Sequence, residues 1–396
     1  MINGSDTAWL MTATVLVLLM TLPALALFYG GLVQAKNILS VLVQCCAVAC
    51  VASVLWFGCG YSLAYSGTGD WLGDLSAAFL QNGGRSMVHP GTSIPESVYV
   101  MFQMTFAIIT PALIIGAFAE RVRFGWVMLF SALWLMVVYL PTSHSIWGGG
   151  WMAKMGVRDF AGGIVVHTTA GVSALVLALM IGPRRGFPNH ALLPHSPAMT
   201  MIGAGMLWVG WFGFNGGSAL AADATAGAAI LATHLAASTA ACVWIALEWL
   251  TFRKATSVGI ATGAVAGLAT ITPAAGFVSP LAAVIIGGAG AGLCFWAVIA
   301  TKQRFKVDDS LDVFAVHGVG GMTGSLLLAI FSPQGAMGRT LGEQAIGVAV
   351  VALWAAIASF VLAKIAALAI PMRVDAEAEQ NGLDLSYHGE RAYELD

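Results

Sequence analysis

The chain has 396 residues, of which 59% are hydrophobic and only 9% are charged, and its mean hydropathy is +0.85. A soluble domain of this length must cover itself with polar surface, so this composition excludes a soluble globular protein and indicates one that crosses a membrane repeatedly. The formal net charge of −2 is too small to favour a nucleic-acid or acidic partner.

Eleven apolar runs are long enough to cross about 30 Å of hydrocarbon, which takes roughly 17 to 25 helical residues. We therefore predict an all-α polytopic membrane protein with eleven transmembrane helices. The predicted spans are residues 8–33, 38–64, 97–119, 124–142, 161–181, 198–214, 221–251, 257–274, 278–301, 313–331 and 341–370.

The basic residues favour one orientation of these spans. Loops on one side of the predicted membrane hold only Arg85, Lys154, Arg158 and Arg339. Cytoplasmic loops are enriched in Lys and Arg, so we predict that the N-terminus lies outside and the C-terminus in the cytoplasm. The start of the chain lacks a basic segment, so we identify no signal peptide ahead of the first span: either one has been removed, or the short N-terminal segment crosses the membrane unaided. The loops on the opposite side, which this orientation places in the cytoplasm, hold Lys36, Arg121, Arg123, Arg184, Arg185, Arg253, Lys254, Lys302, Arg304 and Lys306.

The order of the spans indicates a duplication. Residues 8–181 and 198–331 each contain five predicted spans, so the second half would cross the membrane upside down relative to the first. Such inverted repeats place the substrate path between the halves. We predict a 5+5 inverted repeat plus an eleventh helix over 341–370, together forming a membrane domain of residues 1–370.

A polar tail, residues 371–396, follows the last apolar run. It is too short for a separate domain, but it is suited to docking against the cytoplasmic face or a partner. We expect it to be ordered against the basic loops around Arg121, Arg184, Arg185 and Lys302.

All six cysteines lie inside apolar runs and show no CxxC spacing. We predict that they are buried thiols and neither disulfides nor metal ligands. They are Cys45, Cys46, Cys50, Cys59, Cys242 and Cys294.

Two histidines recur at matching places in the two halves. Asp159 precedes an apolar run that contains His167, and Asp312 precedes another that contains His317. A histidine in a membrane helix is costly unless it is paired or faces a cavity. Two facing neutral imidazoles can share one hydrogen bond and leave a nitrogen each for a small solute. We predict that this pair lines a pore, whereas the lone His234 is interpreted as a structural or interface residue.

Each acid precedes a helix, where a carboxylate can accept hydrogen bonds from free backbone N–H groups. We predict helix capping for both Asp159 and Asp312. For Asp159 we add an electrostatic role, because an acid near an outward-facing mouth would favour a cation there.

Aromatic residues gather around that predicted mouth. Aromatic faces attract a desolvated cation by about 2 kcal/mol or more, and a hydroxyl can accept a hydrogen bond from an N–H donor. We predict a cation-recruitment site at these residues, while an interfacial aromatic belt is the alternative interpretation for Trp147 and Trp151. The residues are Phe102, Phe106, Trp147 and Phe214, with Ser218 just beyond.

Several short motifs, in order and spacing, resemble the ammonium transporter (Amt/Mep/Rh) family over nearly the whole chain. Trp147 and Ser218 favour its bacterial Amt branch over the Rh branch. The motifs are Gln103–Phe106, Gly116–Arg121, Trp147–Gly150, Asp159–Gly163 with His167, Gly210–Asn215 with Ser218, Asp308 and Asp309 leading to Val316–Gly318, and, in the tail, Gly382–Asp384 and His388–Glu390.

The resemblance implies a homotrimer of eleven-helix subunits in the bacterial inner membrane, each subunit with its own pore and without a cofactor. It also implies a PII-type signalling protein that plugs the cytoplasmic exit. It assigns ammonium recruitment to Phe102, Phe106, Trp147 and Ser218, a stacked gate to Phe106 and Phe214, a twin-histidine pore to His167 and His317, and a pore lining to Trp211 and Tyr29.

Moving a bare monovalent cation into hydrocarbon costs tens of kcal/mol in the Born limit, whereas a neutral amine that keeps a hydrogen bond costs only a few. We therefore expect NH4+ to bind outside, lose its proton and pass as NH3, which would exclude potassium. The resemblance favours separate transport of the proton or its charge.

Two other functions remain open at this stage. A metal or haem protein could use His167 and His317 as ligands, but no carboxylate or thiol lies within helical reach of either. An ammonium sensor would need a PII-type partner, because the tail is short. We expect no enzymatic activity.

Overall fold

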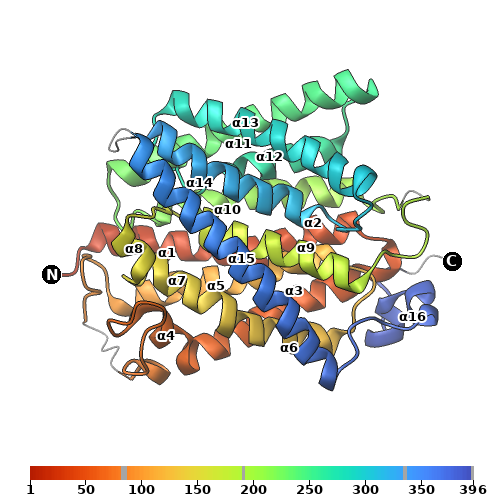
Figure 1. The fold of residues 1–396 in the computed structure, drawn as a ribbon, viewed down its shortest axis with the longest axis horizontal. Helices are drawn as coiled ribbons and strands as arrows, with labels where there is room; N and C mark the ends of the chain where they lie inside the picture. Colours follow the sequence, from red (N-terminus) through yellow and green to blue (C-terminus); the bar gives the residue numbers. More distant parts are fainter. Residues whose placement is uncertain (82–86, 190–191, 333–336, 394–396) are drawn as a thin grey trace.

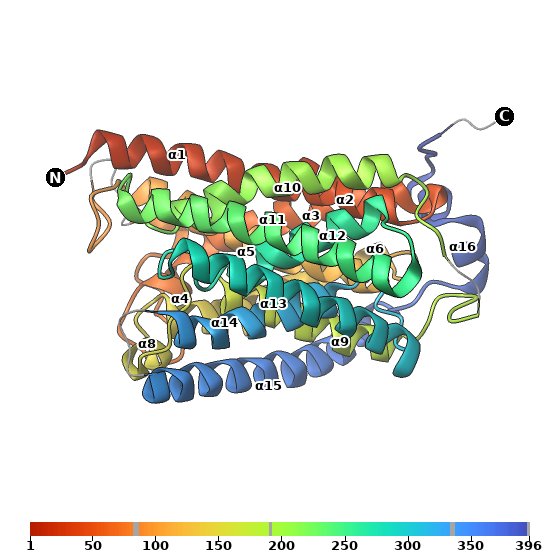
Figure 2. The same cartoon turned by 90° about the horizontal axis from the view of Figure 1, so that it is seen from above.

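The computed structural model describes residues 1–81, 87–189, 192–332 and 337–393 of the chain. Within these residues the regular elements are helices, accompanied by two isolated β-bridges. The long helices run side by side, and the two termini lie at opposite ends of the bundle (Figures 1 and 2). We call these ends the N-terminal end and the tail end.

Ten described segments are long and apolar enough to cross a membrane, and α12 (Ser257–Ile271) is a shorter apolar helix. The prediction of an all-α polytopic protein is therefore confirmed. A helix occupies each of the eleven predicted runs, while the number of helices that cross the membrane stays a prediction. Arg85, which entered the orientation argument, lies outside the described residues.

The first half of the chain forms nine helices with described bounds. They are α1 (Gly4–Leu19), α2 (Ala26–Leu32), α3 (Ile38–Leu55), α4 (Tyr61–Tyr65), α5 (Glu96–Phe118), α6 (Phe124–Trp134), α7 (Leu140–Ile146), α8 (Trp151–Met155) and α9 (Thr169–Ile181).

The second half adds α12 and six further helices. They are α10 (Pro197–Gly217), α11 (Ala224–Phe252), α13 (Pro280–Ile299), α14 (Val319–Phe331), α15 (Met337–Ala369) and the short α16 (Ala376–Asn381) in the tail. Helix α15 crosses one face of the bundle obliquely (Figure 1) and packs on α9, α14 and α6. Its outward face carries large apolar side chains such as Leu353, Phe360 and Leu368, which suit contact with lipid.

Wide π turns lead into the two helices that carry the paired histidines. The turn Gly163–Thr168 precedes α9, and the turn Phe314–Gly318 precedes α14. Such turns are frequent at functional sites.

Glycine permits α9 and the turn before α14 to touch. A Cβ atom on Gly171 would lie 2.1 Å from the backbone nitrogen of Gly318, a separation that no larger residue could tolerate. Small residues at such crossings let two helix backbones approach closely in lipid. The crossing therefore brings the two histidine-bearing turns together.

The cysteine prediction is partly wrong. Cys45 and Cys294 are buried, but Cys46, Cys50 and Cys242 are exposed, although all six cysteines are free thiols. The reason is that membrane helices are apolar both where they pack and where they face lipid. Hydropathy therefore does not identify which apolar position is buried.

Four charged groups form a buried network at the tail end. Arg184 pairs with Glu120 at 2.7 Å and with Asp308 at 2.8 Å, and Arg121 lies 3.9 Å from Asp308. Burial alone would raise the pKa of Asp308, but the hydrogen bonds and positive charge of Arg184 lower it below the usual value. The network ties together three loops that are far apart in the sequence.

The tail is ordered against this end of the bundle. The Asp384 carboxylate accepts hydrogen bonds from the backbone N–H groups of Leu39 and Ser40 at 3.0 and 2.7 Å, so it caps α3. The Asn37 side chain accepts another from the backbone of Leu383.

The expected contact with the basic loops is also present, but only in part. The Arg185 backbone N–H donates to Glu379, and the Arg121 carbonyl accepts from the backbone of Val374. Lys302 instead pairs with Asp312. The start of α3 is thus a docking site that the distribution of charge did not indicate.

The Asp384 contacts generate a prediction. Asp384→Ala should release the tail, because two N–H groups lose their acceptor, and it should destabilise this cap by about 1 kcal/mol. Hydrogen exchange of the tail in purified protein measures the release. Glu390→Ala is the matched control, since Glu390 is an exposed acid of the same tail. Equal exchange in both variants would contradict the docking role of Asp384.

Candidate functional site

The aromatic residues predicted for the mouth meet in one place. The ring centroids of Phe102 and Phe106 lie 5.1 Å apart, and Trp147 and Phe106 meet edge to face with centroids 5.8 Å apart. Phe214 from α10 lies against Phe106 with ring centroids 4.3 Å apart and a tilt of 35°. Phe102, Phe106 and Phe214 are fully buried. The tilted Phe106–Phe214 pair forms the floor of this aromatic cluster.

Ser218 begins the turn after α10, beside the same cluster. Its hydroxyl donates to the carbonyl of Phe214 at 2.8 Å, so its oxygen keeps lone pairs for another donor. A Cβ atom on Gly217 would come within 2.7 Å of the Phe102 ring. Glycine at position 217 therefore lets Phe102 pack beside Ser218.

Trp147 and Asp159 flank α8, which lies at the N-terminal end of the bundle (Figures 1 and 2). The Trp147 indole N–H donates to the Asp159 carbonyl at 2.7 Å. This bond fixes the indole edge-on to Phe106.

The Asp159 carboxylate accepts four backbone hydrogen bonds at 2.7 to 2.9 Å. Burial raises the pKa of Asp159, and these four bonds offset only part of that rise. The geometry agrees with the predicted cap, and both oxygens are occupied, so any attraction for a cation acts at a distance. The donors are Gly162, Gly163, Ile164 and Val165.

His167 and His317 meet at the centre of the bundle. Their Nδ1 atoms lie 3.2 Å apart and their rings are inclined by 20°. One Nδ1 must carry the proton and the other must accept it. Both side chains are buried, and the Nε2 atom of His167 has no hydrogen-bond partner in the described chain.

Trp211 stacks on His167, with ring centroids 5.5 Å apart and an inclination of 23°. Its indole N–H donates to the Thr272 hydroxyl at 2.9 Å. Thr272 is a supporting residue that the sequence did not reveal, because its only signal is one threonine in an apolar run. It holds the indole parallel to the imidazole.

A narrow apolar cavity lies between Phe214 and the two histidines. Its volume, measured as the space that the centre of a water-sized sphere can reach, is about 10 Å³. This is room for one molecule of that size. The lining is Met20, Leu25, Phe28, Ile109, Leu113, Val166, His167, Leu207, Trp211, Phe214, Val265 and His317.

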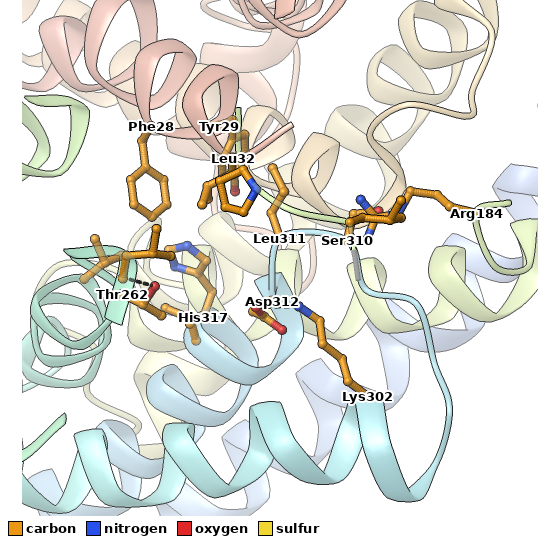
Figure 3. A pocket seen from close by; sticks show the side chains of 15 residues that line it. Phe28, Tyr29, Leu32, Arg184, Thr262, Lys302, Ser310, Leu311, Asp312 and His317 are labelled. Carbon is orange, nitrogen blue, oxygen red and sulfur yellow. Dashed lines mark hydrogen bonds and ion pairs between the residues drawn. The ribbon is translucent and has the colours of Figure 1, made fainter. Parts of the chain in front are cut away.

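A wider and more polar pocket of about 180 Å³ lies on the other side of His317, toward the tail end (Figure 3). Phe28, Tyr29 and Thr262 line it together with the Lys302–Asp312 ion pair. Tyr29 therefore lines this pocket and not the narrow cavity. Its hydroxyl donates to the carbonyl of Leu113 at 2.9 Å.

The predicted cap at Asp312 is wrong. Asp312 has a left-handed backbone, with φ of 62°, and its carboxylate pairs with Lys302 at 2.7 Å. Asp309 instead accepts from the backbone N–H of Phe314 at 2.7 Å, and burial together with Asp312 raises the pKa of Asp309 to about 7. The backbone turn between the two acids decides which one faces the helix.

His234 lines neither the narrow cavity nor the wider pocket. It is exposed on α11, with its ring 5.4 Å from Trp208. Among the described residues, no cluster of three His, Cys, Asp or Glu side chains is arranged to hold a metal ion.

Comparisons with known proteins agree on one family. The model of the Ammonium Transporter Family matches residues 8–393. The ammonium transporter of Bacillus subtilis is 44% identical, with 98% of each chain covered. A solved structure titled "Sensor Amt Protein" superposes with a TM-score of 0.91 at 29% identity, covering 97% of this chain and 98% of the other. Mep2 of Saccharomyces cerevisiae superposes with 0.85 at 34% identity, covering 94% and 91%.

The four bonds to Asp159 generate a second prediction. Asp159→Ala should destabilise the protein by about 3 to 5 kcal/mol, because four buried N–H groups lose their acceptor together. Asp223→Ala is the control, since Asp223 caps α11 through one bond to Ala226 and should cost about 1 kcal/mol. Denaturant unfolding in detergent measures both, and equal losses would contradict the prediction.

Proposed function

Because the chain belongs to the ammonium transporter family, we propose that it recruits NH4+ at the aromatic cluster, removes a proton and conducts NH3 through the narrow cavity. Family membership and the multi-pass fold support ammonium transport across a membrane. The main support for deprotonation and NH3 conduction is the buried His167–His317 pair. Its Nδ1 atoms lie 3.2 Å apart beneath the paired rings of Phe106 and Phe214.

Recruitment is assigned to Phe102, Phe106, Trp147 and Ser218. The aromatic rings offer negative π faces to a cation, and the Ser218 oxygen can accept an N–H hydrogen bond. Asp159 adds negative charge near the site, although its oxygens bond the backbone.

Phe106 and Phe214 act as the gate between this site and the narrow cavity. A cation that enters the cavity would lose nearly all its hydration at a cost of tens of kcal/mol in the Born limit, whereas desolvating neutral NH3 would cost only a few kcal/mol. A potassium ion has no proton to give up and is therefore held at the gate.

The imidazoles then provide hydrogen bonds in an otherwise apolar passage. The Nε2 atom of His167 has no partner in the described chain, and Trp211 holds the His167 ring in a fixed plane. Each imidazole nitrogen can donate or accept according to its tautomer, so the pair can also pass a proton. We infer that transport carries net charge.

Beyond His317, the solute enters the wider pocket beside Tyr29, where the Lys302–Asp312 pair makes the walls polar. There the proton passed along the imidazole pair can rejoin NH3, so that NH4+ is re-formed and one positive charge is transferred. The tail end would then face the cytoplasm, with the N-terminus outside, in a bacterial inner membrane.

We extend the proposal to assembly and partner. The chain would form a homotrimer with one pore in each subunit, and a PII-type signalling protein would bind at the tail end. The basic loops and the docked tail support a partner surface there. The two halves of the membrane domain, residues 8–181 and 198–331, would form the inverted repeat.

A second candidate is an ammonium sensor that acts through the PII-type partner. The likeness to the structure titled "Sensor Amt Protein" supports it. Ammonium-evoked current on reconstituted protein distinguishes the two, because a transporter gives sustained current and a sensor alone does not. Absence of any ammonium flux would overturn the transport proposal.

Trp147→Leu should weaken ammonium recruitment and leave the fold intact. The reason is that the variant loses the ring beside Phe106, while the glycine-flanked turn remains. Apparent affinity is measured from the ammonium dependence of current, and a fall of about tenfold is expected from the loss of a cation–π contact. Trp354→Leu, on the lipid-facing helix α15, is the control; an unchanged affinity in Trp147→Leu would assign this tryptophan to the interfacial belt.

Replacing both His167 and His317 by leucine should leave a folded protein without proton-coupled current or without exclusion of potassium. Each single replacement should be less stable than the double, because it leaves one buried imidazole unpaired. His234→Leu, outside the cavity, is the control for current and stability. Selective ammonium current of normal size in the double variant would rule out the twin-histidine role.

A further inference from the structure

The N-terminal half of α5 carries a polar stripe next to its pore-facing stripe. Glu96, Tyr99 and Gln103 are spaced by three and four residues, so they share one face of the helix. Phe102 and Phe106 share another face, rotated from the first by about 70° at roughly 100° per residue. Any rotation of the polar face therefore moves the two phenyl rings.

The polar face is held by a partly buried hydrogen bond. The Tyr65 hydroxyl donates to the Gln103 side-chain oxygen at 2.9 Å and lies 3.1 Å from the Ser143 hydroxyl. The Tyr99 hydroxyl belongs to the same hydrogen-bonded group. These residues lie on α4, α5 and α7, so one phenol joins three helices.

The first turn of α5 is held as well. The Glu96 carboxylate accepts a hydrogen bond from the Tyr61 hydroxyl, and its other oxygen lies 2.8 Å from Nδ1 of His89. The His89 ring stacks on Tyr99, with centroids 3.5 Å apart and an inclination of 10°. The loop before α5 and the helix α4 thus both bind the N-terminal end of α5.

None of these side chains lines the narrow cavity or the wider pocket. We propose that the group, which we call the α5 anchor, sets the rotation of α5 and thereby the position of Phe102 and Phe106. Tyr65 and Gln103 are its central positioning residues. This inference rests on the proposed recruitment and gating roles of the two phenyl rings. The anchor consists of Tyr61, Tyr65, His89, Glu96, Tyr99 and Gln103.

Directional hydrogen bonds add to the restraint that packing places on helix rotation, because the hydrophobic effect itself has no direction. A side chain lies about 5 to 6 Å from the helix axis, so a rotation of about 10° moves a ring by about 1 Å. The narrow cavity, which is lined by the gate partner Phe214, has room for only a single small molecule. A displacement of about 1 Å at such a site can cost up to about 100-fold in rate.

Tyr65→Phe tests the inference, because it removes the hydroxyl and keeps the ring. In reconstituted full-length protein, the apparent affinity for ammonium should fall by about 2- to 12-fold, the equivalent of one lost hydrogen bond, with a smaller change in maximal current. Gln103→Leu should have the same effect. The double variant should be no worse than the poorer single, since both remove one bond.

Ser359→Ala is the matched control. The Ser359 hydroxyl is buried and bonds Ser173 at 2.7 Å and the Trp134 indole at 3.2 Å, away from α5. Ser359→Ala should lower the stability of the protein and leave its apparent affinity for ammonium unchanged. An unchanged affinity in Tyr65→Phe, or an equal loss in Ser359→Ala, would overturn the anchor.

Gln103→Leu carries the same test if Tyr65→Phe does not fold. Trp147→Leu, measured in parallel, distinguishes failure of the anchor proposal from failure of the proposed function. Impaired affinity in Trp147→Leu with normal affinity in the anchor variants would refute the anchor and keep the proposed function. Absence of any ammonium flux in the unaltered protein would refute the proposed function itself.

Discussion

Two imidazole rings meet at the crossing of α9 with the turn before α14, and the hydrogen bond between their Nδ1 atoms sets the demands on the surrounding chain. Gly171 and Gly318 must touch so that the two turns reach each other. Trp211 must lie flat against His167, which requires the bond to Thr272. A buried imidazole pair is tolerated in this apolar setting because each ring satisfies one nitrogen of the other.

The acidic groups near the two ends of the helix bundle bind backbone N–H groups. Asp159 holds four N–H groups, Asp309 holds the turn that precedes α14, and Asp384 holds the start of α3. Backbone N–H groups in a membrane protein must find hydrogen-bond acceptors within the protein. Acids at helix ends therefore have a structural role that does not depend on the solute. In our proposal, selection therefore falls to the aromatic cluster and the histidines.

Much of the candidate site could be predicted from the sequence. His167 and His317 stood out because ionisable groups are costly inside a membrane helix and because they recur in both halves. Phe102, Phe106, Trp147 and Phe214 were predicted to gather, and they do. By contrast, Gln103 formed part of a recognised motif without any indication that its partner is Tyr65, which lies 38 residues away.

The sequence by itself determined that this chain is a helical membrane protein, since its hydropathy is a local property that survives without knowledge of contacts. It also determined which residues could do chemistry in lipid. Only the tertiary structure decided whether each apolar residue is buried or faces outward: Cys46 is exposed, whereas Cys45 is buried. Only the structure decided that Asp309 and not Asp312 caps the turn before α14. Both depend on helix rotation and backbone turns, which long-range packing sets and local sequence does not.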